Sequence, residues 1–131
     1  MTLYRAPVNE MRFLLEDVLD TRQLTEIPTQ VEASTESLLS LAEEAAKLIE
    51  NELAPLRVAS DAGCSFLDGE VHTPAGYPAF YQRFVEAGWA GITHRSEHGG
   101  AGLPFLLGKI VEEMLCSANV AFALYPALTS G

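Results

Sequence analysis

A glycine-rich turn between two segments of helical character constrains the fold more than any other part of this sequence. The first segment runs from Pro78 to Ala87 and ends at Gly88, which can adopt the left-handed conformation that terminates helices. The second segment begins at Pro104 and continues with apolar residues at helical spacing. The glycines at positions 99, 100 and 102 allow a sharp reversal between them. This stretch therefore predicts two helices joined by a tight turn.

The N-terminal region predicts one short helix followed by a connection. Apolar residues recur at three- and four-residue spacing from Val8 to Leu19, which is typical of an amphipathic helix. The predicted apolar face consists of Met11, Leu14, Leu15, Val18 and Leu19. The spacing lapses from Asp20 to Ala33, where we expect a linker or a loosely docked stretch.

The strongest helical pattern lies in the first half of the chain. It begins near Ser34 or Thr35, either of which can cap free backbone N–H groups, and it is expected to end before Pro55. Its polar face predicts an exposed ion pair between Glu43 and Lys47. We interpret this face as solvated surface rather than as a site.

The remaining segments complete an all-α prediction. Residues 56–76 lack helical spacing and predict an irregular surface loop, which ends in a type I turn at Thr73-Pro74-Ala75-Gly76. Ser117 or Asn119 is expected to cap a last helix that the chain leaves truncated. No alternating run is long enough to predict a sheet.

Charge and composition exclude several classes of function. The chain of 131 residues has 18 Asp plus Glu against 8 Lys plus Arg, a net charge of −10. Nucleic acids and anionic membrane surfaces would repel such a protein. The sequence has no apolar run of the roughly 18 residues that a membrane span needs, and its two cysteines form no disulfide framework. We therefore expect a cytoplasmic protein with no membrane span.

Two groups of residues resemble chemical motifs but have simpler explanations. The glycines at 99–102 lack the Lys-Ser/Thr of a phosphate-binding loop and the spacing of a dinucleotide turn. His94 and His98, with His72 earlier in the chain, straddle a turn and lack a suitably spaced fourth ligand for zinc. The sequence therefore predicts no cofactor-binding and no metal site in this chain.

Candidate catalytic side chains are equally weak. Glu112 and Glu113 are adjacent on a helix and point about 100° apart, so they cannot act as a pair of acids. Glu113 follows Lys109 by four residues, which predicts a surface ion pair. Cys116 is expected to be a buried, inert thiol. We predict no catalytic residue in this chain.

Several motifs together resemble one enzyme family. They are Gly88-Trp89-Ala90-Gly91, the stretch Glu97–Pro104, the opening Tyr4-Arg5-Ala6-Pro7 with Met11–Leu15, and the segments Val111–Asn119 and Phe122–Gly131. Their order resembles the amino-terminal helical domain of the acyl-CoA dehydrogenases, in the branch with an N-terminal extension. The resemblance implies an extension helix and linker over 1–33 and a helical bundle domain over 34–131 that is incomplete at its C-terminal end.

The resemblance also implies a reaction and its partners. Members of this family use FAD to desaturate acyl-CoA thioesters between the α and β carbons, and they pass the electrons to an electron-transfer flavoprotein. The resemblance implies a middle β domain and a C-terminal helical bundle after the N-terminal domain. The FAD lies between the middle and last domains and the glutamate base usually comes from the last, so we expect this chain alone to be inactive and free of flavin. A homo-oligomer and a role in fatty acid metabolism are expected. The alternatives are a non-catalytic acidic helical interaction module and a subunit of a split dehydrogenase.

The resemblance places one candidate site, at the base of the acyl-chain pocket. Ala123 and Ala127 are spaced to share a helical face, with Leu124 and Leu128 close beside them. Small side chains there would leave depth for an acyl chain. Alternatively, the alanines only let two helices approach closely. Tyr125 is a weaker candidate, because Pro126 is expected to bend the helix.

Overall fold

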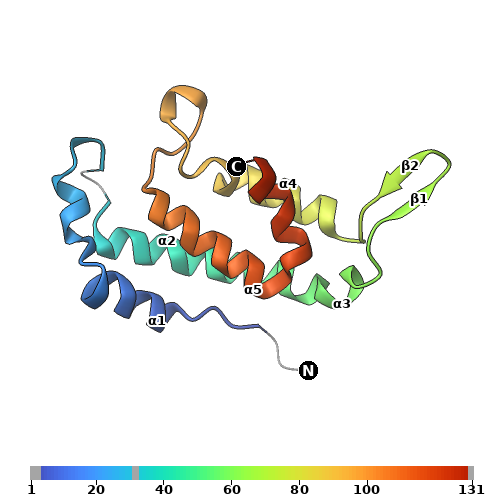
Figure 1. Cartoon of the computed structure of the whole chain (residues 1–131), viewed down its shortest axis with the longest axis horizontal. Helices are drawn as coiled ribbons and strands as arrows, with labels where there is room; N and C mark the ends of the chain where they lie inside the picture. Colours follow the sequence, from blue (N-terminus) through green and yellow to red (C-terminus); the bar gives the residue numbers. More distant parts are fainter. Residues whose placement is uncertain (1–3, 31–32, 130–131) are drawn as a thin grey trace.

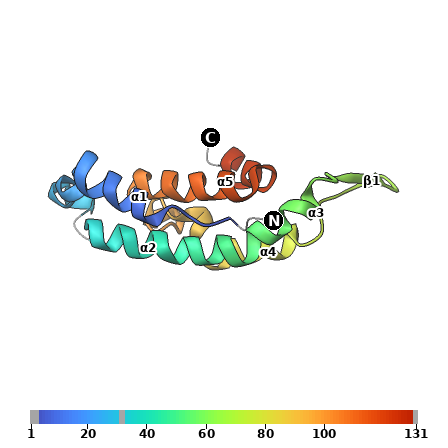
Figure 2. The ribbon, with the colours of Figure 1, turned by 90° about the horizontal axis from the view of Figure 1, so that it is seen from below.

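The computed structural model describes residues 4–30 and 33–129, and it confirms a mostly helical domain. Figure 2 shows two layers, with α1 (Val8–Phe13) and α5 (Phe105–Thr129) on one side and α2 (Thr35–Leu48) and α4 (Tyr77–Glu86) on the other. Helix α2 contacts both α1 and α5, and the core lies between the layers. In the described ranges no helix combines the length and apolarity that a membrane span requires.

The predicted N-terminal helix forms, but its apolar face is narrower than expected. Met11 and Leu15 are buried, whereas Leu14, Val18 and Leu19 are exposed. For Val18 and Leu19 the cause is a π-helical turn at Leu14–Val18, closed by a bond from the Leu19 N–H to the Leu14 carbonyl. Such a turn holds an extra residue and so shifts the following side chains around the helix.

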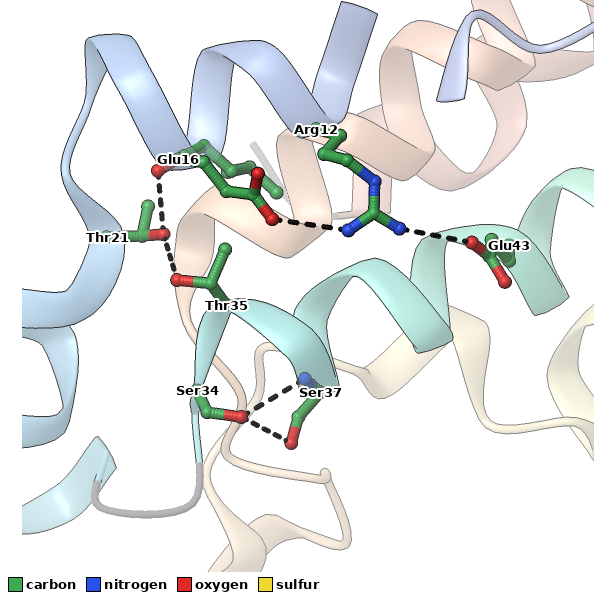
Figure 3. Close-up of polar contacts among 8 residues, drawn as sticks. Arg12, Glu16, Thr21, Ser34, Thr35, Ser37 and Glu43 are labelled. Carbon is green, nitrogen blue, oxygen red and sulfur yellow. Dashed lines mark hydrogen bonds and ion pairs between the residues drawn. The ribbon is translucent and has the colours of Figure 1, made fainter. Parts of the chain in front are cut away.

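The stretch from Asp20 to Ala33 is more ordered than a loose linker. It contains two 3₁₀-helices, Thr21–Glu26 and Pro28–Gln30, while residues 31 and 32 lie outside the described part. The buried Thr21 hydroxyl donates to the Leu15 carbonyl at 2.9 Å and is 2.8 Å from the Thr35 hydroxyl (Figure 3). Thr21 therefore connects the end of the first helix to the start of α2.

Helix α2 begins with the predicted cap, which is Ser34. Its hydroxyl oxygen accepts the Ser37 N–H at 3.1 Å (Figure 3), as a serine in the N-cap position does. The predicted pair between Glu43 and Lys47 is wrong: Lys47 pairs with Glu44, and Glu43 lies 3.8 Å from Arg12 of the neighbouring α1. The packing of α1 against α2 thus gives Glu43 a partner on the neighbouring helix instead of Lys47.

The helical path does not end before Pro55 as predicted. Helix α2 continues as a π-helical turn at Ile49–Leu53, a 3₁₀ turn at Ala54–Leu56 and the short helix α3 (Arg57–Ser60). Pro55 occupies the second position of the 3₁₀ turn, where its missing N–H breaks no hydrogen bond. The proline therefore starts a new helical segment instead of ending helical structure.

The predicted irregular loop contains a β-hairpin. Strands β1 (Ser65–Leu67) and β2 (Glu70–His72) pair antiparallel, with Phe66 opposite Val71. Asp68 and Gly69 both have positive φ, as a type I′ hairpin turn requires. The hairpin projects from the helices (Figure 1), and its residues are exposed.

Helix α4 follows a turn that lies one residue later than predicted. The Pro74 carbonyl accepts the Tyr77 N–H, and Gly76 in the third position has φ +88°, which excludes the predicted type I geometry. The helix buries Tyr77, Phe80 and Phe84 and ends at Gly88, whose φ of +84° confirms the predicted helix end.

The glycine-rich segment is the predicted tight turn. Gly99 and Gly102 have positive φ, and a Cβ on Gly100 would lie 2.1 Å from the His94 carbonyl oxygen. The Gly102 N–H donates to that oxygen, and the Ala101 N–H donates to the Gly91 carbonyl. Only glycine fits this approach of two backbone segments.

Helix α5 is bent between its two halves (Figure 1). Its first half buries Leu107, Val111 and Leu115. Asn119 has non-helical dihedral angles, and its side-chain oxygen accepts the Phe122 N–H at 3.2 Å. Of the two predicted caps, Asn119 is therefore the one that starts the last helical segment.

Candidate substrate groove

A groove of about 310 Å³ lies between α4, the loop that follows it and both halves of α5. The second half of α5 contributes Ala123, Pro126 and Ala127 to its lining. Ala123 is buried, and Ala127 is half-buried. Since residues four apart share a helical face, the two alanines lie one above the other along the groove.

Leu124 and Leu128 lie outside this groove. Their exposed fractions are 56% and 81%, so both side chains lie on the surface of the described chain. Each leucine follows an alanine by one residue, a rotation of about 100° around the helix. The structure thus separates the four predicted pocket residues into two alanines on the groove and two leucines beside it.

Aromatic and aliphatic side chains from other parts of the chain complete the groove. Phe84 comes from α4 and Trp89 from the turn after Gly88, while Val111 and Leu115 come from the first half of α5. Phe84 was recognisable as a helical core position, but its proximity to Ala123 depends on how α4 packs against α5. These side chains give the groove one apolar wall, against which an alkyl chain fits, while Thr93, Lys109 and Glu112 add polar groups to its lining.

Charged groups occur at the rim of the groove. Lys109 pairs with Glu112 at 2.5 Å, and its ammonium lies 4.9 Å from the centre of the Phe105 ring. The predicted ion pair between Lys109 and Glu113 is therefore wrong. On a helix, side chains three and four residues apart are both neighbours, so Glu112 can pair with Lys109 as readily as Glu113.

Tyr125 lies on a second, smaller hollow of about 260 Å³ that is also lined by Tyr77, Tyr81 and Phe122. The Tyr125 hydroxyl lies 3.6 Å from the Cys64 sulfur, and this hydrogen bond raises the pKa of Tyr125. Phe122 is fully buried and meets Phe80 edge to face at 4.8 Å.

Other candidate residues lie apart from both hollows. Cys116 is exposed, so the prediction of a buried thiol is wrong; it lies one position from the buried Leu115 and faces away from the core. His94 and His98 lie on the exposed glycine-rich turn. Among the residues that the structure describes, no three potential metal ligands gather at one place.

The glycine-rich turn does not fit the phosphates of a flavin nucleotide. Phosphate-binding loops offer free backbone N–H groups to the ligand. Here the N–H groups of Gly100, Ala101, Gly102 and Leu103 all donate to carbonyls of the same turn. The backbone N–H groups that a phosphate would need are therefore already hydrogen-bonded within the turn.

Comparison with known proteins identifies the domain. Residues 35–131 match the family model described as "Acyl-CoA dehydrogenase, N-terminal domain". The chain belongs to the acyl-CoA dehydrogenase family. It is also 34% identical over 129 residues to a protein of Ruegeria pomeroyi named 3-methylmercaptopropionyl-CoA dehydrogenase. That alignment covers 98% of this chain and 22% of the relative.

The groove lies entirely inside the segment that matches the acyl-CoA dehydrogenase family. Helix α1 and the residues before it precede that segment and contact it through charged and polar groups, among them Arg12 of α1 with Glu43. Arg5 pairs with Glu50 at 2.6 Å, and the Ala6 N–H donates to the other oxygen of the same carboxylate at 2.8 Å. The N-terminal residues of the chain thus bind to the π-helical turn that follows α2.

Proposed function

We propose that this chain is the N-terminal helical domain of an FAD-dependent acyl-CoA dehydrogenase and that its groove receives the far end of the acyl chain. We place the extension helix and linker at 1–33 and the family domain at 34–131. The observation that supports the proposal most is the groove whose apolar wall includes Ala123 and Ala127, which lies within the family match. Apolar walls stabilise a bound alkyl chain by removing it from water.

In the proposed reaction, a base removes a proton from the α carbon while a hydride leaves the β carbon, and a double bond forms. Bound FAD would accept the hydride, and an electron-transfer flavoprotein would then reoxidise it. The residues described here would bind and orient the acyl chain and exclude water from it. Because the glycine-rich turn does not fit a flavin phosphate, we assign flavin binding and the base to parts of the enzyme outside this chain.

The named relative suggests a first substrate to test. Its name states an action on 3-methylmercaptopropionyl-CoA, a thioester with a short acyl group. We propose an acyl-CoA substrate for the enzyme containing this chain, a homo-oligomeric state and a cytoplasmic location. The preferred acyl length is the quantity that the groove would control.

A steady-state assay of the full-length protein tests this proposal. Purified protein should carry flavin and reduce an artificial electron acceptor with acyl-CoA substrates, including 3-methylmercaptopropionyl-CoA. A full-length protein without flavin and without activity toward any acyl-CoA would reject it.

One observation favours the alternative of a non-catalytic interaction module. Val120, Leu124 and Leu128 leave an apolar strip exposed on a chain of net charge −10. A module or a subunit of a split dehydrogenase would form a stable complex with a second chain. Flavin in the complex but not in the isolated chain would indicate the split enzyme. Absence of flavin from both the complex and the isolated chain would indicate the module.

A further inference from the structure

Asn119 interrupts α5 at a single buried point. Its φ of −161° and ψ of 88° describe extended backbone between two helical stretches. The residue is 4% exposed, so its amide is removed from water. A buried amide is costly without hydrogen-bond partners, and Asn119 finds them on three elements.

Each polar atom of the Asn119 side chain has a defined partner. The oxygen accepts the Phe122 N–H at 3.2 Å, which caps the second half of α5, and it accepts the Tyr77 hydroxyl of α4 at 2.8 Å. The amide nitrogen donates to the Ser60 hydroxyl at the end of α3, at 3.4 Å. One side chain therefore starts a helical segment and fixes that start against α3 and α4.

The groove alanines follow from this point at helical spacing. Ala123 and Ala127 lie four and eight residues after Asn119, so a change in the direction of the segment would move both along the groove wall. We propose that Asn119 is a positioning residue, which sets the direction of the second half of α5 and thereby the depth of the groove. The link to acyl-chain selectivity rests on the function proposed above.

Amide hydrogen exchange in the full-length protein tests the positioning role without reference to activity. Asn119→Ala should speed exchange across residues 120–128 by roughly tenfold, because a cap and a buried hydrogen bond are lost together. Residues 107–115 should keep their protection. Asn119→Asp should largely restore slow exchange, since a carboxylate still accepts both the Phe122 N–H and the Tyr77 hydroxyl.

A pair of tyrosine variants isolates the contact with α4. Tyr77→Phe removes the hydroxyl that donates to the Asn119 side-chain oxygen and should speed exchange over residues 120–128 by roughly two- to tenfold. Tyr81→Phe is the matched control, because it removes a hydroxyl one turn along α4 that makes no hydrogen bond to Asn119 within the described ranges. Unchanged exchange in Asn119→Ala, or equal acceleration in both halves of α5, would overturn the proposal.

Substrate selectivity provides the second measurement. In Asn119→Ala, kcat/KM should change with acyl length, whereas kcat on the shortest substrate stays within about twofold. An equal loss for short and long substrates would refute a link between Asn119 and groove depth. If the wild-type protein oxidises no acyl-CoA, the proposed function fails by itself, and the exchange data still decide whether Asn119 positions the segment.

Discussion

The carboxylate of Glu50 holds the N-terminal segment through two oxygens, one 2.6 Å from the Arg5 guanidinium and one 2.8 Å from the Ala6 N–H. The Glu50 side chain is 16% exposed, whereas that of Arg5 is 76% exposed. The bond to the backbone N–H is therefore better shielded from water than the ion pair. This geometry explains how a segment outside the helices stays in place.

Replacement of Glu50 by alanine should release this segment. We expect a loss of about 1–2 kcal/mol in the free energy of unfolding, because a hydrogen bond to a charged group is lost. Chemical denaturation measures the loss. Glu44→Ala is the control: Glu44 pairs with Lys47 on an exposed face, so its removal should cost less than about 0.5 kcal/mol. Equal losses in the two variants would contradict a special role for Glu50.

Tyr4 should make folding stability fall at high pH. Burial raises the pKa of Tyr4 to about 12, and the negative charges of Glu113 and Glu50 add to the effect. An unfolded tyrosine has a pKa of about 10, so the folded state favours the neutral phenol. The free energy of unfolding therefore keeps its full value below about pH 10 and falls as the pH rises toward 12, because the unfolded chain loses the Tyr4 proton more readily than the folded one.

The variant Tyr4→Phe provides the comparison. Among the described residues, the buried Tyr4 hydroxyl has no hydrogen-bond partner, so its removal at neutral pH should be neutral or stabilising by up to about 1 kcal/mol. The difference in unfolding free energy between wild type and variant should shift against the wild type between pH 10 and 12. A pH-independent difference would show that Tyr4 titrates normally.

The chain of 131 residues should be colourless when purified by itself. Its glycine-rich turn uses its backbone donors internally, and we assign the flavin site to other domains. We expect no visible flavin absorbance after gel filtration and no desaturation of an acyl thioester. Stoichiometric flavin retained on the column would disprove this expectation.

The sequence predicted the helix ends, which depend on interactions between residues close together in the chain. Ser34 caps α2 and Gly88 ends α4 because each depends on backbone groups within a few residues. The hairpin also had a local signal in Asp68-Gly69, the usual pair for a type I′ turn. Its strands are three residues long, too short for their alternation to be recognised.

Features that depend on packing could not be predicted in the same way. Val18 and Leu19 match a helical apolar face in sequence, yet a π-helical turn places them on the surface. The alanine spacing correctly placed Ala123 and Ala127 on one face. That Trp89 lies across from them depends on the path of the glycine-rich turn, which no periodic pattern describes.

The exposed strip of Val120, Leu124 and Leu128 should promote self-association of the 131-residue chain or leave this segment frayed. Phe122 is not part of the strip, because it is buried in the aromatic cluster. Analytical ultracentrifugation should show oligomers that Leu128→Glu disperses, or amide exchange should be fast over residues 120–128. A monomer with slow exchange over that range would count against both outcomes.

Enlarging either groove alanine should shorten the longest acyl chain that the full-length enzyme accepts. A phenyl ring in Ala123→Phe or Ala127→Phe would occupy space in the groove, and each displaced methylene would lose about 0.8 kcal/mol of binding. The loss in kcat/KM should therefore grow roughly fourfold per added methylene and spare short substrates. Leu128→Phe is the matched control, since residue 128 is 81% exposed and lies outside the groove. If short and long acyl groups lost activity by the same factor, the alanines would serve helix packing alone.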